Sequence, residues 1–293
     1  MKPAAFEYCR PDSVEEALTL LEEFGPEASV LAGGMSLGVM LNMRLVRPAA
    51  LIDVKRVQGL DSVVAQGDQI RTGATLRQAA AMRDATLMHS VPLLALALPY
   101  VGHFQTRNRG TLGGSVAHAD PSAEIPLVLA TLGGTVELVS RRGTRRVGAR
   151  EFFIDVLTTA RESDELLTAL LWPTRRAGAG HAFAEVSQRR GDFAVVAIAA
   201  AAVLEADGTL AHLALGLDGV EARPTLADTT AFLGRTADDK LARAIAEAAA
   251  DAADPMSDLR ATADYRRALV RTSGAAVLAA AFEEAEKNCA EKH

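Results

Sequence analysis

The stretch "VLAGGMSLGVMLNMRLVRP", residues 30–48, sets a pair of glycines between two predicted elements of secondary structure. The apolar run at 29–32 predicts a buried strand, and the pattern over 36–46 predicts a helix that ends at Arg47–Pro48. Gly33 and Gly34 form the turn between them. Because glycine has no side chain, the backbone at this turn is free to approach a ligand closely. The sequence therefore predicts an α/β unit whose turn is a candidate binding loop.

The flanking residues extend this unit on both sides. Ser13 is a predicted N-cap with Glu16 three residues later, and the apolar residues that follow share one helical face as far as Gly25–Pro26. A further strand is predicted at 50–54. Residues 1–57 are therefore predicted to form a small helix–strand–helix–strand subdomain.

The remaining residues predict a second subdomain, 58–176, and a C-terminal domain, 178–290. For the second subdomain we expect, in order, a hairpin at 63–74, helices at 75–84 and 92–100, a polar loop at 102–126, a helix at 126–132, a hairpin at 135–147 and a strand at 166–171. After a linker at 173–180, we expect three antiparallel strands and then three Ala-rich helical pieces within 225–287, broken near Gly234 and Pro255. The predicted fold class is α+β, with a first domain at 1–176 made of both subdomains.

Composition narrows the possible functions. The chain has 293 residues, 49% of them hydrophobic, which suffices for sizeable cores. Its formal net charge of −6 gives no basic excess, so nucleic acid is not an expected partner. The two cysteines lie near opposite ends and provide no ligand set for an iron–sulfur cluster. The longest apolar stretches, 91–101 and 193–204, are shorter than the roughly 20 residues of a membrane helix, so no transmembrane segment is expected.

Several common catalytic motifs are absent from the sequence. There is no GxGxxG, GxxxxGK[ST], HExxH or GxSxG pattern, and the six histidines show no metal-ligand spacing. These absences argue against a stand-alone NAD enzyme, a kinase, a zinc hydrolase and a serine hydrolase. We therefore predict no catalytic residue and no metal ligand on this chain.

A second glycine pair, Gly113–Gly114, lies between Thr111 and Ser115. Successive exposed N–H groups form an anion-binding nest, and the neighbouring hydroxyls add further donors. For either pair alone, a tight turn is the favoured interpretation. Two pairs with hydroxyl neighbours, one of them inside a long polar passage, favour a phosphate-bearing ligand.

The polar passage ends in "AHADPSAEIP", which contains Asp120 and Glu124. A carboxylate beside a phosphate nest commonly accepts hydrogen bonds from sugar hydroxyls. Asp120 is equally well placed to cap the helix expected at Pro121, and both roles are compatible. His118 is interpreted as a hydrogen-bonding loop residue, because no nucleophile accompanies it.

Taken together, these motifs resemble the FAD-binding medium subunit of molybdenum hydroxylases, the carbon-monoxide dehydrogenase and xanthine dehydrogenase family. The resemblance runs from about residue 4 to 287 and rests on "AGGMSL" (32–37), "RNRGTLGGSVAHADPSAEIP" (107–126), "DELLTAL" (164–170) and "RRGDFA" (189–194). It implies a vanillyl-alcohol-oxidase-type FAD-binding domain in two α/β subdomains. It also implies a carbon-monoxide-dehydrogenase-flavoprotein-like C-terminal domain, an antiparallel sheet with a helix bundle.

The resemblance also implies a set of FAD-binding residues. The residues implied to hold or flank the pyrophosphate are Leu31, Ala32, Gly33, Gly34, Met35, Ser36, Leu37, Thr111, Gly113, Gly114 and Ser115. Asp120 is implied to hold ribose or ribityl hydroxyls, with Glu124 nearby. Those implied to meet the adenine and flavin rings are Leu166, Leu167, Val101 and Phe193.

The same resemblance implies that the chain transfers electrons within a larger complex. A large subunit carries the molybdenum cofactor, and a small subunit carries two [2Fe-2S] clusters that pass electrons to the FAD and on to an external acceptor. The implied assembly is a dimer of heterotrimers in the cytoplasm, with peripheral attachment at the inner face of the membrane left open. Two alternatives remain at this point: a stand-alone FAD oxidase of the vanillyl-alcohol-oxidase type, and a non-redox nucleotide-binding scaffold.

Three positions depart from the family pattern. Met35 stands where relatives often have Gln or His, and Glu185 stands where many have Lys. Phe193 stands where an aromatic hydroxyl is common, so it is able to stack but has no hydrogen bond to donate. Glu185 therefore puts in doubt any cationic contact with the nucleotide from that position.

Overall fold

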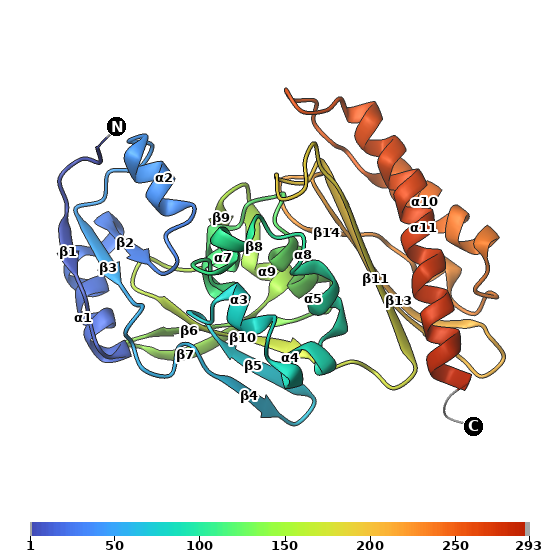
Figure 1. The fold of residues 1–293 in the computed structure, drawn as a ribbon, viewed down its shortest axis with the longest axis horizontal. Helices are drawn as coiled ribbons and strands as arrows, with labels where there is room; N and C mark the ends of the chain where they lie inside the picture. The colour runs from blue at the N-terminus through green and yellow to red at the C-terminus, as the bar shows by residue number, and fades with distance from the viewer. Residues whose placement is uncertain (1, 291–293) are drawn as a thin grey trace.

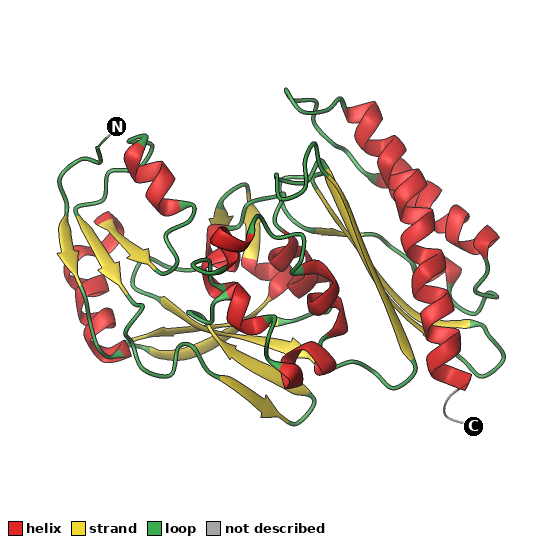
Figure 2. Ribbon diagram, viewed as in Figure 1, coloured by secondary structure: helices red, strands yellow, loops and turns green. Residues whose placement is uncertain are grey.

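A computed structural model describes residues 2–290 of the protein. The chain forms three parts in a row, with the N-terminus at one end of the molecule and the C-terminal helices at the other (Figure 1). Each part has its own sheet (Figure 2). None of the helices in the described range is long and apolar enough to cross a membrane.

The first part is a three-stranded parallel sheet with one helix against it. Its strands, in the order β1-β3-β2, are β1 (Glu7–Cys9), β3 (Ala50–Asp53) and β2 (Ala28–Leu31). The predicted first helix is confirmed as α1 (Val14–Phe24), whose first turn is capped by the Ser13 hydroxyl accepting from the N–H of Glu16 at 3.1 Å. A short 3₁₀ turn, η1 (Gly25–Glu27), follows it.

The helix predicted at 36–46 is shorter in the structure. It forms α2 (Leu37–Asn42) and stops because Arg44 takes a left-handed conformation with φ +58°. The strand predicted at 29–32 begins and ends one residue earlier, as β2. The strand–turn–helix order around Gly33–Gly34 is otherwise as expected.

The middle part is a five-stranded antiparallel sheet. Its strands, in spatial order, are β4 (Val63–Gln66), β5 (Gln69–Gly73), β10 (Leu166–Pro173), β6 (Thr135–Ser140) and β7 (Gly143–Gly148). Both predicted hairpins and the later strand are confirmed. The buried Trp172 on β10 donates its Nε1–H to the Thr72 hydroxyl on β5 at 2.9 Å, which fixes the two strands to each other.

Short helices cover this sheet, and here the sequence prediction needed most correction. The helices and small strands are α3 (Gln78–Ala81), α4 (Ala85–Ser90), α5 (Pro92–Ala97), α6 (Phe104–Arg107), α7 (Leu112–His118), α8 (Glu124–Thr131), α9 (Ala149–Phe152), β8 (Phe153–Asp155) and β9 (Thr158–Thr159). The helix expected at 75–84 is only α3, because Asp84 caps a new helix, α4, through the N–H of Leu87 at 2.8 Å. The helix expected at 92–100 is the shorter α5.

The passage 102–126, expected as a loop, is largely helical. It contains α6, α7 and the first turn of α8. Thr111 caps α7, and Leu112 and Val116 bury one face of it in the core. Its two glycines, which weaken helix propensity, concealed this helix in the sequence.

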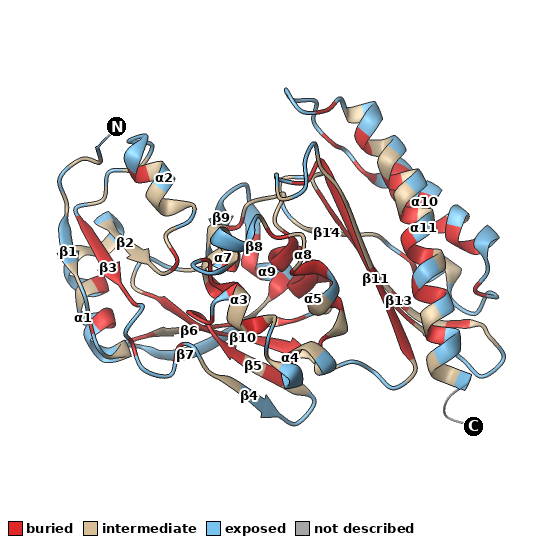
Figure 3. Cartoon of the chain, viewed as in Figure 1, coloured by how far each residue is buried: buried red, intermediate tan, exposed pale blue. Residues whose placement is uncertain are grey.

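The third part is a four-stranded antiparallel sheet between two layers of helices. Its strands are β11 (Ala179–Val186), β12 (Val196–Leu204), β13 (Leu210–Asp218) and the short β14 (Thr225–Leu226), one more than expected. The region 225–287 holds three helical pieces, as expected, with breaks near Gly234 and Pro255: a 3₁₀ turn, η2 (Thr230–Phe232), and two α-helices, α10 (Asp239–Ala252) and α11 (Ala263–Ala290). Because α5 and α8 lie on one face and α11 on the other, the Ala-rich β12 is buried on both sides (Figure 3).

Three hydrophobic cores run through the molecule. One lies under α1, one between the middle sheet and its helices, and one between the third sheet and α10 and α11. The middle core includes Ala194, Ala197 and Ala199 from the third part. The third part therefore packs directly onto the middle part, through the face of its sheet that α5 and α8 cover.

Candidate cofactor site

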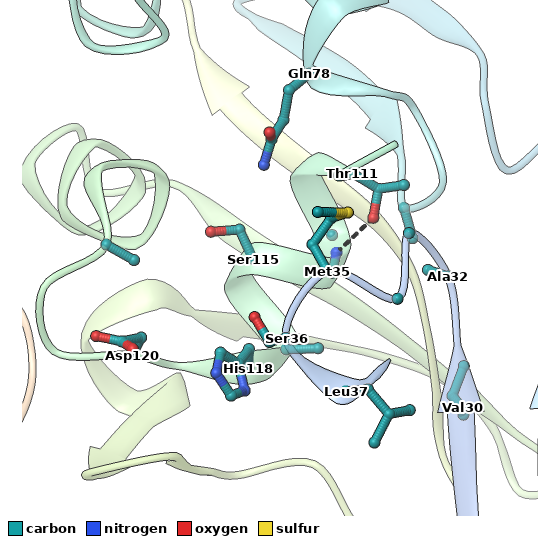
Figure 4. A pocket seen from close by; sticks show the side chains of 18 of the residues that line it. Val30, Ala32, Met35, Ser36, Leu37, Gln78, Thr111, Ser115, His118 and Asp120 are labelled. Carbon is teal, nitrogen blue, oxygen red and sulfur yellow. Dashed lines mark hydrogen bonds between the residues drawn. The ribbon is translucent and has the colours of Figure 1, made fainter. Parts of the chain in front are cut away.

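A cavity of about 520 Å³ lies where the three parts of the chain meet. Five segments line it, and they lie within residues 28–40, 74–78, 101–124, 161–167 and 191–193. Val54 completes the lining. The turn after β2 lies next to the start of α7, and Asp120 and His118 lie toward one end (Figure 4). A volume of this size is typical of a site for a small organic ligand or cofactor.

The two glycine loops form one wall of this cavity by direct backbone contact. A Cβ built on Gly33 overlaps the carbonyl oxygen of Arg109 and lies 2.8 Å from the Cα of Gly110. A Cβ on Gly113 lies 2.6 Å from the Cα of Ala74. Only glycine fits at these two positions, because each lies against the backbone of another segment.

The first loop presents free N–H groups to the cavity. Within the described chain, the backbone N–H groups from Gly33 to Ser36 have no hydrogen-bond acceptor, and all four residues line the cavity. Gly34 has φ +71°, a conformation that L-residues rarely adopt. Consecutive N–H groups in such a turn form a nest that suits an anion.

The second loop is the start of α7, which two hydrogen bonds hold in an ordered conformation. The Thr111 hydroxyl accepts from the N–H of Gly114 at 2.9 Å, and the N–H of Ser115 donates to the carbonyl oxygen of Thr111 at 3.2 Å. The Ser36 and Ser115 hydroxyls lie on the cavity side (Figure 4). Hydroxyl and backbone N–H donors from both loops thus face the same space, and none of these donors is a lysine side chain.

The far end of the cavity is acidic. Asp120 accepts from the N–H of Ser122 at 2.9 Å and does not cap α8, whose N-cap is Ala123 without a side-chain bond. The preceding Ala119 is held at φ +52°. Glu124 is only 7% exposed, and burial, together with the neighbouring carboxylates, raises its pKa to about 8. This carboxyl is therefore largely protonated at neutral pH.

Two further titratable side chains line the cavity. Burial lowers the pKa of His118, so its imidazole is neutral at pH 7, although Asp120 opposes the shift. Arg161 donates to the carbonyl oxygens of Glu162 and Glu165 at 3.0 and 2.8 Å, and burial lowers the pKa of its guanidinium. It is the one arginine or lysine of the cavity lining in the described residues.

The structure brings together nearly all of the residues singled out from the sequence. Those that line the cavity are Ala32, Gly33, Gly34, Met35, Ser36, Leu37, Val101, Thr111, Gly113, Gly114, Ser115, Asp120, Glu124, Leu166, Leu167 and Phe193. Leu31 is the exception and does not line it. Its side chain lies behind the turn, where Leu31 Cδ1 is 3.1 Å from a Cβ built on Gly34.

Sequence reasoning missed Gln78 and Arg161. The Gln78 side chain is buried in the cavity wall, and its Oε1 atom has no hydrogen-bond partner in the described chain. Gln78 is held there because its N–H donates to the carbonyl oxygen of Gly110 at 2.9 Å. No local signal marks either residue, since their position depends on packing between distant segments.

Phe193 lies at the rim of the cavity with part of its ring exposed. The guanidinium carbon of Arg260, from the segment between α10 and α11, lies 5.2 Å from the ring centroid. This cation–π contact covers one side of the ring and helps to orient it.

Comparison with known proteins identifies the family. Residues 4–175 match the family described as the FAD binding domain in molybdopterin dehydrogenase, and residues 181–286 match the CO dehydrogenase flavoprotein C-terminal domain. The chain belongs to the FAD-binding medium subunits of molybdenum hydroxylases. The family resemblance and the α+β fold class expected from the sequence are thus confirmed.

Relatives of this medium subunit span its whole length. The 6-hydroxypseudooxynicotine dehydrogenase complex subunit alpha of Paenarthrobacter nicotinovorans is 35% identical over 97% of both chains. A chain of carbon monoxide dehydrogenase from Hydrogenophaga pseudoflava superposes with a TM-score of 0.94 at 32% identity, covering 97% of this chain and 99% of that one. A chain of quinoline 2-oxidoreductase from Pseudomonas putida 86 gives a TM-score of 0.93 at 34% identity, covering 97% and 99%.

Proposed function

We propose that the cavity holds FAD and that the chain is the electron-transfer medium subunit of a three-subunit molybdenum hydroxylase. The observation that carries this proposal is the run of free N–H groups from Gly33 to Ser36, which faces the start of α7. In a family of FAD-binding subunits, this donor set fits the pyrophosphate of the cofactor.

The shape of the cavity supports the fit of the rest of the cofactor. Gly33 and Gly113 let backbone segments pack closely, so that the donors of both loops line one cavity. Asp120 is free to accept from sugar or ribityl hydroxyls, while Leu166 and Leu167 provide an apolar wall for the adenine. Val101 and Phe193 provide surfaces for the flavin ring. When bound, FAD supplies the redox chemistry, accepting and releasing electrons singly or in pairs.

The residues of this chain bind, orient and shield the cofactor. Backbone donors hold the phosphates without a mobile lysine, so the site is formed before the ligand arrives. The neutral His118 and the protonated Glu124 add little charge near the phosphates at pH 7. In such a site the dipoles of backbone N–H groups stabilise a dianionic group, and cationic side chains do not neutralise it.

The wider role follows from the family. We propose that electrons reach the FAD from [2Fe-2S] clusters on a small subunit and leave to an external acceptor, and that a large subunit carries the molybdenum cofactor. A dimer of heterotrimers in the cytoplasm is the assembly that we expect, and we expect the chain to divide into domains at 1–176 and 178–290. The substrate is chosen on the large subunit, and the relatives' names accordingly differ, from 6-hydroxypseudooxynicotine to quinoline.

The test is an absorption spectrum and a metal analysis of the complex purified from its native host. Bound FAD on this chain, with molybdenum and iron on co-purifying large and small chains, is the expected result. FAD on a chain that purifies alone and turns over a substrate would overturn the subunit role in favour of a stand-alone oxidase. Absence of flavin after reconstitution with FAD would leave a non-redox scaffold.

A further inference from the structure

Two carboxyl groups meet at the boundary between the middle and third parts of the chain. Glu124 lies in the first turn of α8 and lines the cavity, with 7% of its surface exposed. Glu185 lies near the end of β11, and its Oε2 atom is buried with no hydrogen-bond partner in the described chain. Glu185 lies opposite Ala197 of β12, which belongs to the middle core, and α8 packs against β12, so the two carboxyl groups lie on the same boundary and their charges interact.

The surroundings of this pair are also acidic. Asp218, at the end of β13, is fully buried, and neither of its carboxyl oxygens has a partner among the described residues. Asp120 adds a further negative charge to the surroundings of Glu124, and the Ser187 hydroxyl donates to the carbonyl oxygen of Arg189 at 3.0 Å.

Arg161 of the cavity lining and the buried Arg266 have other partners. Arg161 donates to backbone carbonyl oxygens after β9, and Arg266 binds Asp258 and the carbonyl oxygens of Val195 and Gly219. The described residues therefore provide no counter-ion to either member of the pair.

Two neighbouring carboxylates with little water and no cation do not both ionise near neutral pH. The pair loses its first proton near the ordinary pKa of a carboxyl group. The two groups share the second proton and retain it to higher pH. Burial is the largest cause that raises the pKa of Glu124, and the charge and hydrogen bond of Glu185 add to it. Burial also raises the pKa of Glu185.

We propose that Glu124 and Glu185 share one proton across this boundary, and that an anionic dinucleotide in the cavity strengthens the hold on that proton. The second half rests on the proposed function, because it takes FAD as the dinucleotide. A pyrophosphate in the same cavity as Glu124 adds negative charge, which favours the protonated pair over the doubly ionised one. Binding and protonation are reciprocal, so loss of the proton at alkaline pH weakens FAD binding.

The shared proton is tested first on the full chain without FAD, by infrared spectroscopy across pH 5 to 9. The expected result is a protonated-carboxyl C=O band that titrates near pH 8 and disappears in the Glu124→Gln/Glu185→Gln double variant. Asp218, whose pKa burial raises well above its ordinary value, is present in both proteins, so its contribution cancels in the comparison. A double variant whose titrating band matches that of the unmodified chain would overturn the shared proton.

The linkage is tested by the dissociation constant of FAD, measured from flavin fluorescence over the same pH range. At pH values above the pKa of the pair in the FAD-free chain, the affinity for FAD is expected to fall as pH rises. The fall is at most about tenfold per pH unit, which is the limit for one linked proton. The double variant is expected to lose this slope. Glu205→Gln, which removes an exposed carboxylate at the end of the same sheet, is the matched control and keeps it.

A second variant guards against misfolding of the first. Glu185→Lys turns the like-charged pair into an ion pair with Glu124, so its FAD affinity is expected to be flat with pH in this range. An unchanged slope in both variants would overturn the linkage. If FAD binds at no pH, the proposed function and the linkage both fail, while the infrared titration still decides whether the proton is shared.

Discussion

Gly33 lies where two backbone segments from different parts of the chain touch, so its lack of a side chain has a measurable consequence. In Gly33→Ala the new methyl group overlaps the carbonyl oxygen of Arg109 and forces the two loops apart. We expect FAD affinity to fall by about tenfold or more, since each 1.4 kcal/mol of lost binding free energy is one factor of ten. Fluorescence titration with FAD measures this.

Gly38 provides the matched control for that substitution. It lies in α2, the short helix that follows the turn of Gly33, and a Cβ built on it meets nothing within 4 Å. Gly38→Ala is therefore expected to bind FAD as the unmodified chain does. Equal affinities for the two variants would show that the close approach at Gly33 does not shape the site.

Glu124 makes a prediction about stability and pH that needs no cofactor. Its pKa is about 8 when folded and 4.5 in its ordinary state, so between these values the folded chain binds more protons than the unfolded chain. The free energy of unfolding contributed by this group therefore falls as pH rises from about 4.5 to 8. Glu124→Gln is expected to flatten this decline.

Urea unfolding at several pH values between 5 and 8.5 measures the effect. Glu124→Gln is expected to be more stable than the unmodified chain at the alkaline end, where the unmodified protein holds a buried charge. Near pH 5 the two are expected to be similar. A parallel decline in both proteins would assign the pH dependence to other groups.

At the scale of single elements, α7 shows how a cap creates a site. Thr111 ends the preceding loop, caps the helix through Gly114 and so sets the direction in which the second glycine loop faces. Thr111→Val removes the cap and is expected to cost about 1 kcal/mol of stability. It is also expected to weaken FAD binding, because the start of α7 frays at the cavity wall.

A second helix cap separates these two effects. Ser13 caps α1 in the same way, through the N–H of Glu16, but lies away from the cavity. Ser13→Ala is expected to lose similar stability by urea unfolding and to keep its FAD affinity. Loss of affinity in both variants would mean that global stability, and not the α7 cap, governs binding.

At the scale of the whole molecule, the cavity draws its walls from all three parts. Phe193 and Asp192 come from the third part, while the glycine loops come from the first and middle parts. FAD at 100 times its dissociation constant is expected to stabilise the chain by about 2.7 kcal/mol. Hydrogen exchange is expected to slow in residues 191–193 as well as in the glycine loops.

The location of the protected amides tests this view of the cavity. Protection confined to the first and middle parts would mean that the third part does not close over the cofactor. The cation–π contact offers a control, because Arg260→Ala is expected to loosen Phe193 and to reduce protection only in residues 191–193.

The sequence alone determined the features that depend on neighbours along the chain. Ser13 with Glu16, the hairpins of the middle sheet and the two glycine pairs follow from local capping, alternation and backbone freedom, and the motifs around them placed the chain in its family. All but one of the site residues predicted in this way line the cavity, because they cluster around those motifs.

Tertiary structure decided what depends on contacts between distant segments. It showed that the two glycine loops touch, that Gln78 leaves a buried oxygen unpaired, and that Asp120 does not cap α8. The sequence singled out Glu124 and Glu185 separately, and only the packing of the third sheet against α8 gives them a common, poorly solvated space. Burial and charge proximity are properties of the folded chain, so a local pattern of residues does not carry them.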